Sequence, residues 1–334
     1  MNRFYYDHLA ITEQRYYEKV LRALEHRENS ISPSLMIYDE AFEKVLRAIN
    51  YDHPELFYVD FQRLAYMKTP LGVSYTPNYS YRSAVQNMML SQIDSTAASI
   101  LQTAKAAGVK TPYEHLRWIH NYLVKNVKYN YEAVRHPDMY PDAFNCFGAL
   151  VNKQAVCEGI SKAFKFLCDK AGIDVFVVSG ESCFANTNQM MAHAWNCAIV
   201  DQRYTHIDVT WDINMSETSK ANRYDYFCIP DSDIAIDHVY SGYPECNTNG
   251  LSYFAQTGRL FSGVKPLKEY LTKELSKNSK VLYFKVVSSP TAPADLHNKI
   301  QSLVGKMIGQ YSTSSYSYQI SHNLKHNIFY YKIF

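Results

Sequence analysis

One cysteine stands at the beginning of a predicted helix. The segment AVCEGISKAF (155–164) opens a run of apolar residues at helical spacing, which Gly172 ends. Unpaired backbone N–H groups and the helix dipole stabilise negative charge at the start of a helix, so Cys157 lies where a thiolate is favoured. Cys168 lies in the last turn, where the dipole has the opposite sign, and we predict that it packs in the core. A cysteine in a first turn is more often structural, so Cys157 is a candidate nucleophile only if a base lies beside it.

A base and a carboxylate occur together in a hairpin that the sequence predicts further along. The stretch HAWNCAIVDQRYTHIDVT forms strands 193–200 and 203–210 if Asp201 and Gln202 make a two-residue turn. In this register His193 and Asp208 lie on one face as diagonal neighbours, with their backbones about 7 to 8 Å apart. An aspartate there can hold the imidazole in one tautomer and stabilise its protonated form. A shift of the register by one residue would separate the two side chains.

The same face of the hairpin also permits other interpretations. Cys197 and His206 could join His193 as zinc ligands, but no fourth ligand has a recognisable spacing. Asp208 and Asp212 are not followed by the alternating oxygen ligands of a calcium loop. A lone histidine on a strand is also commonly a structural residue with its hydrogen bonds satisfied. From these patterns we expect no metal and no cofactor.

The composition is that of an ordinary globular protein. The chain has 334 residues, of which 47% are apolar and 20% charged, and this length predicts two or three units. A net charge of +2 gives no reason to expect nucleic acid or an anionic membrane as partner. The N-terminal stretch MNRFYYDHLAITEQ lacks the apolar segment of a signal peptide, so we expect a cytoplasmic protein. A secreted or surface location stays open if the natural chain begins earlier.

The cysteine pattern and the absent motifs narrow the chemistry further. The seven cysteines are an odd number without a C-x-x-C pair, which favours reduced thiols over a disulfide framework. The GxSxG, GxxxxGK[ST] and GxGxxG motifs do not occur, so serine-hydrolase, P-loop and dinucleotide chemistry are unsupported.

Three regions differ in their patterns and are predicted as separate units. Residues 1–108 are predicted to be mainly helical, and residues 109–261 contain the Cys157 helix and the hairpin. Residues 262–334 predict a small α+β unit with a strand at 280–287, a helix at 294–309 and a closing hairpin. The candidate chemistry therefore belongs to the middle unit.

Three linked motifs in that unit resemble a known family. The V-C-x-G segment at 156–159, the H-A-W-N segment at 193–196 and the H-x-D-V-T-W-D segment at 206–212 are similar to marks of the transglutaminase-like superfamily, in particular its bacterial branch. The resemblance covers about residues 110–250 well and the two ends only loosely. Lys153-Gln154 stands where many relatives have Gly-Lys. None of the calcium-site features of the animal cross-linking enzymes is visible.

The resemblance implies an α+β, papain-like fold, with the Cys157 helix packed on an antiparallel sheet that carries His193 and Asp208. In such a family the cysteine attacks an amide carbonyl and forms a thioester, the histidine transfers protons, and the aspartate orients the histidine. We therefore expect a cysteine peptidase or amidase that acts on a peptide or protein. Transglutaminase-type cross-linking and a non-catalytic scaffold on the same fold are the alternatives.

Three further residues are candidates around the site. The backbone N–H of Cys157 is a candidate oxyanion donor, and Gln154 is a second one. Trp195 and Trp211 flank the predicted strands and are candidate walls of the site, with structural packing as the alternative role for each.

Overall fold

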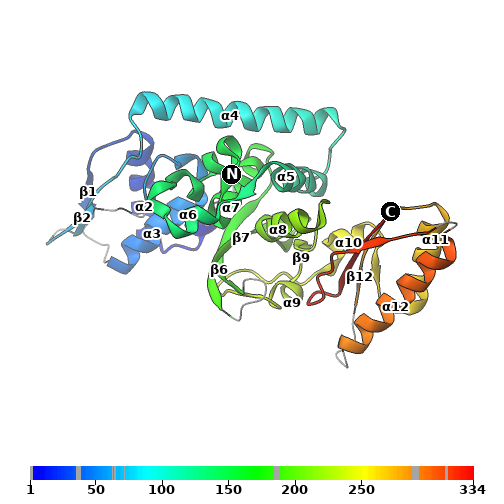
Figure 1. The fold of residues 1–334 in the computed structure, drawn as a ribbon. Coiled ribbons are helices and arrows are strands. Elements are labelled where there is room, and N and C mark those ends of the chain that lie inside the picture. The colour runs from blue at the N-terminus through cyan, green and yellow to red at the C-terminus, as the bar shows by residue number, and fades with distance from the viewer. Residues whose placement is uncertain are drawn as a thin grey trace.

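The computed structural model describes residues 3–34, 39–61, 63, 65–70, 72–183, 189–287, 293–312 and 315–334. The molecule is elongated, and its three regions follow one another in chain order (Figure 1). The N-terminal helices lie at one end, a central sheet with its helices lies in the middle, and a C-terminal sheet with two helices lies at the other end.

The central sheet has five antiparallel strands in the order β10-β6-β7-β8-β9. Helix α7 packs against β6 and β7, and α5 and α8 pack beside α7. The α+β arrangement predicted for the middle of the chain, a cysteine-bearing helix on an antiparallel sheet, is therefore confirmed. The elements are α5 (Pro112–Asn126), α7 (Cys157–Lys170), β6 (Val175–Cys183), β7 (Met190–Val200), β8 (Arg203–Ile207), α8 (Val209–Ser219), β9 (Phe227–Ile229) and β10 (His238–Val239).

The predicted hairpin is present in the predicted register. Val200 pairs with Arg203 and Cys197 with His206. Asp201 and Gln202 both have positive φ, at 49° and 62°, as a tight two-residue hairpin turn requires. The second strand is shorter than predicted, because β8 ends at Ile207 and not at residue 210. Asp208 instead caps α8, since its carboxylate accepts a hydrogen bond from a backbone N–H in the first turn of that helix.

The loop before α7 brings a second segment beside Cys157. Strand β4 (Lys128–Tyr129) pairs in parallel with β5 (Gln154–Ala155), two residues before the helix. Gly159 permits a close approach of this loop, because a Cβ there would lie 2.3 Å from the backbone oxygen of Ala143. Short helices and turns complete the middle of the chain: α6 (Tyr131–Arg135), η2 (Pro137–Met139), η3 (Pro141–Phe144), η4 (Gly148–Asn152), α9 (Asp231–Ile234), η5 (Asn249–Leu251) and α10 (Tyr253–Gln256).

The N-terminal region shares its hydrophobic core with the central sheet. Tyr17 and Val45 belong to the same buried cluster as Phe164 of α7. A three-stranded sheet in the order β1-β3-β2 adds to the helices and was not predicted from the sequence. Its elements are α1 (Phe4–Asp7), α2 (Ile11–Glu25), β1 (Ile31–Ser34), α3 (Asp39–Asp52), η1 (Pro54–Leu56), β2 (Ala65–Thr69), β3 (Gly72–Thr76) and the long α4 (Ser83–Ala106).

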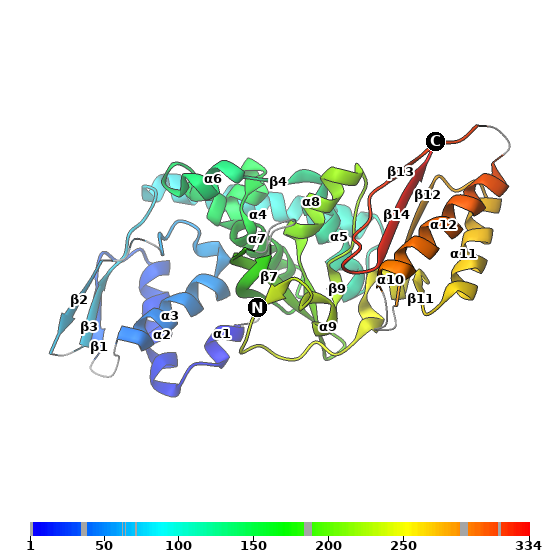
Figure 2. The same ribbon diagram turned by 60° about the horizontal axis from the view of Figure 1, so that its bottom comes forward.

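The C-terminal region has a core of its own. Its sheet has the order β11-β12-β14-β13, and α11 and α12 cover one face (Figure 2). Phe284 and Phe329 face these helices, whereas Tyr283 and Tyr330 belong to a separate buried cluster with Phe254 of α10 on the other side of the sheet. The elements are β11 (Leu260–Phe261), α11 (Val264–Ser276), β12 (Val281–Val286), α12 (Pro293–Tyr311), β13 (Tyr318–Ile320) and β14 (Ile328–Ile333).

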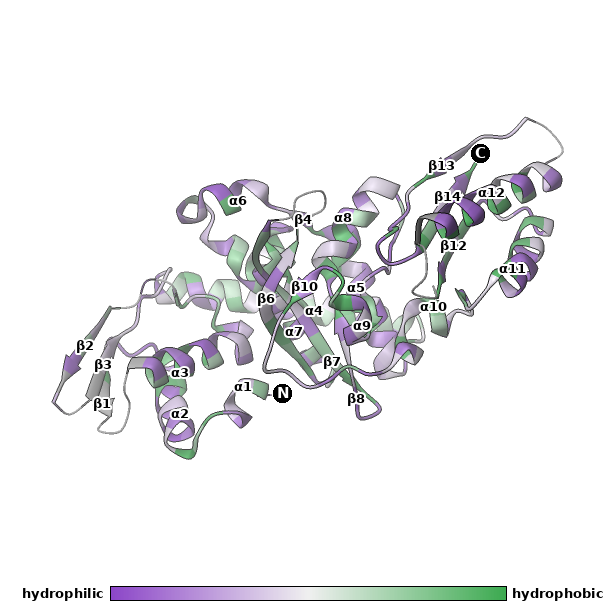
Figure 3. Ribbon diagram, turned by 90° about the horizontal axis from the view of Figure 1, so that it is seen from below, coloured by the Kyte–Doolittle hydropathy of each residue, from purple (hydrophilic) through white to green (hydrophobic). Residues whose placement is uncertain are grey.

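The C-terminal helices contain both polar and apolar residues. Helices α11 and α12 each show both hydrophilic and hydrophobic residues along their length (Figure 3). Among the described residues, no helix has the length and apolar character needed to cross a membrane.

Candidate active site

The structure brings Cys157, His193 and Asp208 together. The Nε2 atom of His193 lies 2.7 Å from Oδ2 of Asp208, and the thiol of Cys157 interacts with the same imidazole. Because Asp208 occupies Nε2, Nδ1 is the ring nitrogen left for the thiol. Cys157 is half-buried at the first residue of α7, while His193 and Asp208 are buried. We call these three residues the Cys157 group.

The electrostatics of the group favour a charged imidazole. Burial by itself would lower the pKa of His193, but the charge of Asp208 and the neighbouring Cys157 raise it to about 10. Burial would likewise raise the pKa of Asp208, but the rings of His193 and His238 hold it well below its usual range. The site therefore favours an imidazolium at His193, the form that the ring takes when it receives the thiol proton of Cys157.

Asp208 is held from three sides. Its Oδ2 atom lies 2.7 Å from Nε2 of His193 and 3.0 Å from Nε2 of His238, and its Oδ1 atom accepts a hydrogen bond of 3.0 Å from the backbone N–H of Trp211. The carboxylate is thus fixed in orientation. Sequence reasoning missed His238, which comes from β10 at the edge of the sheet and has no local spacing that relates it to Asp208.

Tyr129 is a second residue that sequence reasoning missed. Burial raises the pKa of its phenol well above the usual value, and the adjacent Cys157, with which the phenol forms a hydrogen bond, raises it further. Tyr129 reaches Cys157 because β4 pairs with β5 immediately before α7. Cys157 therefore has two side-chain partners, the phenol of Tyr129 and the imidazole of His193.

The other candidates of the sequence analysis lie near the group in different environments. Gln154 is exposed in β5, and its backbone pairs with Lys128. Trp195 is fully buried and stacks on the ring of His193, with 5.8 Å between ring centroids. Trp211 is also buried and packs against His238 and Tyr226. The two tryptophans are part of the packing behind the imidazole.

A second cysteine, histidine and aspartate set gathers around His206 of β8. It consists of Cys246, His206 and Asp231, and we call it the Cys246 group. Nε2 of His206 lies 2.9 Å from Oδ1 of Asp231, and the thiol of Cys246 contacts the same ring. The Sγ atom of Cys246 is 3.7 Å from Sγ of Cys197. All seven cysteines of the chain are free thiols in the structure.

The tautomer of His206 argues against a metal in the Cys246 group. The indole N–H of Trp195 donates a hydrogen bond of 3.1 Å to Nδ1 of His206, so the ring proton must be on Nε2, where it is donated to Asp231. A metal ligand needs its lone pair at that nitrogen. The zinc trio considered from the sequence is not assembled either, since His206 lies with Asp231 and Cys246 while His193 lies with Asp208 and His238.

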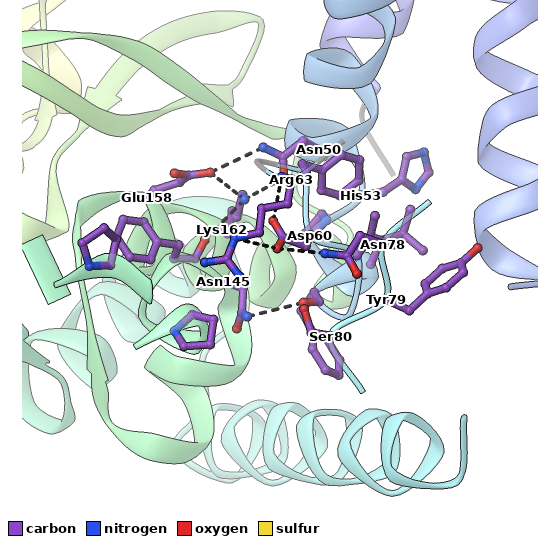
Figure 4. Close-up of a pocket in the computed structure, with 18 of the residues that line it drawn as sticks. Asn50, His53, Asp60, Arg63, Asn78, Tyr79, Ser80, Asn145, Glu158 and Lys162 are labelled. Carbon is purple, nitrogen blue, oxygen red and sulfur yellow. Dashed lines mark hydrogen bonds and ion pairs between the residues drawn. The ribbon is translucent and has the colours of Figure 1, made fainter. Parts of the chain in front are cut away.

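A polar cavity of about 360 Å³ lies between the N-terminal region and the first turns of α7 (Figure 4). Its charged groups are paired within the wall: Lys162 contacts Glu158 at 2.7 Å, and Arg63 pairs with Asp60 and Asp138. The residues of the Cys157 group do not line it. The cavity is therefore separate from the candidate chemistry.

Comparisons with known proteins identify a family whose model matches part of the chain. Residues 101–209 match the family model of the transglutaminase-like superfamily, and the fold expected from the sequence is thereby confirmed. Kyphoscoliosis peptidase of Mus musculus is 26% identical over 143 residues, which are 41% of this chain and 21% of that protein. The Homo sapiens protein of the same name is 26% identical over 134 residues, or 38% and 19% of the two chains. The match thus spans about a fifth of the length of these relatives. A solved structure of a TGase aligns with a TM-score of 0.31 and 15% identity, covering 55% of this chain and 52% of that one.

Proposed function

We propose that this chain, whose residues 101–209 belong to the transglutaminase-like superfamily, is a cysteine-dependent enzyme that cleaves amide bonds in peptides or proteins. The observation that carries the proposal is the position of His193, whose Nε2 atom is held by Asp208 at 2.7 Å and whose ring interacts with the thiol of Cys157 at a helix start. These contacts support the proposed roles of Cys157 as nucleophile, His193 as base and Asp208 as orienting carboxylate.

The proposed reaction begins with the thiol proton. His193 takes the proton of Cys157, and the thiolate attacks the amide carbonyl carbon, so that a C–S bond forms and the carbonyl oxygen becomes an oxyanion. The backbone N–H of Cys157 is the proposed donor to that oxyanion, because an N–H in the first turn of a helix has no intrahelical acceptor. Asp208 keeps the ring of His193 oriented in both its neutral and its protonated form.

Two further steps complete the proposed reaction: the amine leaves first, and water then releases the acyl group from Cys157. His193 gives its proton to the leaving nitrogen, the C–N bond breaks, and a thioester to Cys157 remains. His193 next takes a proton from water, the resulting hydroxide equivalent attacks the thioester, and the acid product is released as the thiol is restored. If a primary amine replaces water in this second half, the product is a new amide.

Hydrolysis is favoured over transfer to an amine. The name of the curated relatives is that of a peptidase, although they match only in a segment. The half-buried thiol also leaves water a path to the thioester. A transferase that excluded water would need a more enclosed thiol.

The test compares the two outcomes on one substrate. The protein is incubated with a glutamine-containing casein, with and without a fluorescent primary amine, and new peptide termini, released ammonia and bound fluorescence are measured together. We expect new termini or ammonia without incorporation of the amine, and loss of all signals in Cys157→Ala. Cys183→Ala, which changes another half-buried thiol, serves as the matched control and retains activity.

Two outcomes would change the proposal. Amine incorporation faster than hydrolysis would assign the chain to transfer. An unchanged rate in Cys157→Ala would remove the enzyme assignment and leave a non-catalytic role for the fold.

A further inference from the structure

A line of alternating carboxylates and imidazoles continues from Asp208 away from Cys157. His238 lies between two acids: its Nε2 is 3.0 Å from Oδ2 of Asp208 and its Nδ1 is 2.6 Å from Oδ1 of Asp237. All three side chains are buried. The proposed reaction uses only the first member of this line, so the remaining members need a separate explanation.

The contacts of His238 determine its protonation. A carboxylate only accepts hydrogen bonds, and each ring nitrogen of His238 faces one. The ring therefore donates from both nitrogens and is an imidazolium. In agreement with this, burial would lower the pKa of His238, but Asp208 and Asp237 raise it, against the opposing charge of His193. The rings of Trp195, Trp211 and Tyr226 enclose it, so its position is fixed.

The far end of the line belongs to the C-terminal region. Oδ2 of Asp237 accepts a hydrogen bond of 2.7 Å from the hydroxyl of Tyr226 and lies 2.9 Å from Nε2 of His326. His326 is 1% exposed and comes from the connection between β13 and β14. Asn323 of the same connection donates a hydrogen bond of 3.4 Å to the hydroxyl of Tyr226.

The connection between β13 and β14 is anchored by a second set of buried polar groups. Arg223 donates hydrogen bonds of 2.8 Å and 3.1 Å to the backbone and side-chain oxygens of Ser321. Its guanidinium also forms a buried ion pair of 2.8 Å with Asp225 and lies over the ring of Tyr283. The loop that carries His326 is therefore held in one place on the central sheet.

We propose that the C-terminal α+β region completes the active site, with His326, Asp237 and His238 acting as positioning residues that hold Asp208 and, through it, His193. This inference rests on the proposed function of the Cys157 group. Burial of several charged groups at a contact between two regions is costly unless every group is paired, and apolar residues would join the regions at lower cost. The line of carboxylates and imidazoles ends on Asp208, the carboxylate that contacts His193. A role in holding Asp208 would explain why charged groups, and not apolar ones, are buried at this contact.

The experiment measures the thiol itself, so it needs no substrate. In the full-length chain, the rate of alkylation of Cys157 by iodoacetamide at pH 7 is followed by mass spectrometry of its peptide. His326→Ala should slow this rate by about three- to tenfold, because one charged hydrogen bond is lost and only part of its effect reaches His193. His326→Gln retains an N–H donor at the reach of Nε2 and should restore most of the rate. Lys325→Ala, an exposed change in the same loop, should leave the rate unchanged.

Two readouts separate a positioning role from a merely structural one. The buried thiols Cys146, Cys168 and Cys228 must stay unmodified, which shows that the variant is folded. The downfield imidazole N–H resonances of His193 and His238 in the proton NMR spectrum should shift in His326→Ala and return in His326→Gln. On a hydrolysed substrate, kcat should fall while KM stays the same.

The outcomes also distinguish this inference from the proposed function. If Cys157 of the unchanged protein reacts no faster than an ordinary thiol, the proposed function fails. If it reacts fast and His326→Ala reacts equally fast with unshifted resonances, the C-terminal region does not position the site and this inference is wrong.

Discussion

The Cys157 group and the Cys246 group contain the same three residue types, and the histidine of each lies on a strand of the central sheet. In both, the Nε2 atom of the histidine contacts an aspartate oxygen, at 2.7 Å for His193 and at 2.9 Å for His206. In both, a cysteine lies beside the ring. Residue type and pairwise distance therefore do not distinguish them.

The two groups differ in which member faces the solvent. Cys157 is half-buried at the start of a helix, whereas Cys246 is fully buried. The exposure of the aspartates shows the opposite difference: the Asp208 side chain is 1% exposed, whereas that of Asp231 is 33% exposed. The thiol is the more exposed member of the first group, and the carboxylate is the more exposed member of the second.

The groups also differ at the second ring nitrogen. Nδ1 of His206 accepts the indole proton of Trp195, so it cannot take a proton from a thiol. Nδ1 of His193 is available to Cys157. Contact with the Cys197 thiol, together with burial, raises the pKa of Cys246 far above that of an ordinary thiol. The exposure of the thiol and the contacts of the second ring nitrogen therefore distinguish the two groups, although their residue types are the same.

Exchange of the two carboxylates for amides gives the largest expected difference between the groups. Asp208→Asn should lower kcat by about 10³- to 10⁴-fold, because the amide no longer holds the imidazolium. Asparagine can still cap α8, so the fold should persist. Asp231→Asn should leave kcat within about twofold and cost ~1–2 kcal/mol of unfolding free energy through weaker hydrogen bonds. Steady-state kinetics and denaturant unfolding of both variants measure this; equal losses of kcat would show that the two groups are not distinct.

The second largest effect is expected in the pH dependence of the unfolding free energy. The folded pKa of His193, about 10, lies above the unfolded value of 6.5, so its pairing with Asp208 stabilises the fold fully below pH 6.5 and is lost as the pH rises through about 10. The Asp208 carboxylate has a lowered pKa in the folded protein. Its contribution to folding stability is therefore present above the unfolded pKa of 3.8 and is lost as the pH falls through the lower folded pKa.

The raised pKa of His193 and the lowered pKa of Asp208 together predict a pH range in which their pairing stabilises the fold most. The difference in unfolding free energy between the unchanged protein and Asp208→Asn should be greatest between about pH 4 and 6.5, at ~3 kcal/mol, and should shrink toward pH 10. Urea unfolding at a series of pH values measures it. A difference that stays constant from pH 5 to 10 would contradict the charged pair.

A change at Trp195 gives the smallest effect and tests the link between the groups. Trp195→Phe keeps an aromatic ring beside His193 and removes the proton donated to His206. We expect kcat to fall by about two- to fivefold and the unfolding free energy by ~1–2 kcal/mol, from one lost hydrogen bond and a smaller ring. Trp118→Phe, a half-buried change away from both groups, is the control. A loss of kcat as large as that of Asp208→Asn would mean that the groups act as one unit.

Much of the Cys157 group could be predicted from the sequence, because its parts depend on local rules. The helix that begins at Cys157 and ends before Gly172 follows from apolar spacing and from a glycine, which the structure shows at φ 71°. The hairpin register follows from the two-residue turn at Asp201 and Gln202. The end of β8 could not be predicted, because Asp208 lies in a sequence compatible with either a strand or a helix cap, and the cap prevailed.

The residues around the group could not be found in this way. His238 lies 30 residues from Asp208 in the chain, and His326 lies 89 residues from Asp237. Tyr129 reaches Cys157 only through the pairing of β4 with β5. No periodicity relates residues that meet through the packing of separate elements.

Helix starts and hairpin parity depend on neighbours along the chain, so the amino-acid sequence alone predicts where a thiolate, an imidazole and a carboxylate can meet. Which of the two groups has the more exposed thiol, and which histidine has its Nδ1 atom occupied by an indole N–H, depends on contacts between distant segments. Exposure and tautomer are set by what packs on each side chain, namely Trp195 on His206 and the line from His326 to Asp208 behind His193. These contacts join segments whose relation exists only in the folded chain.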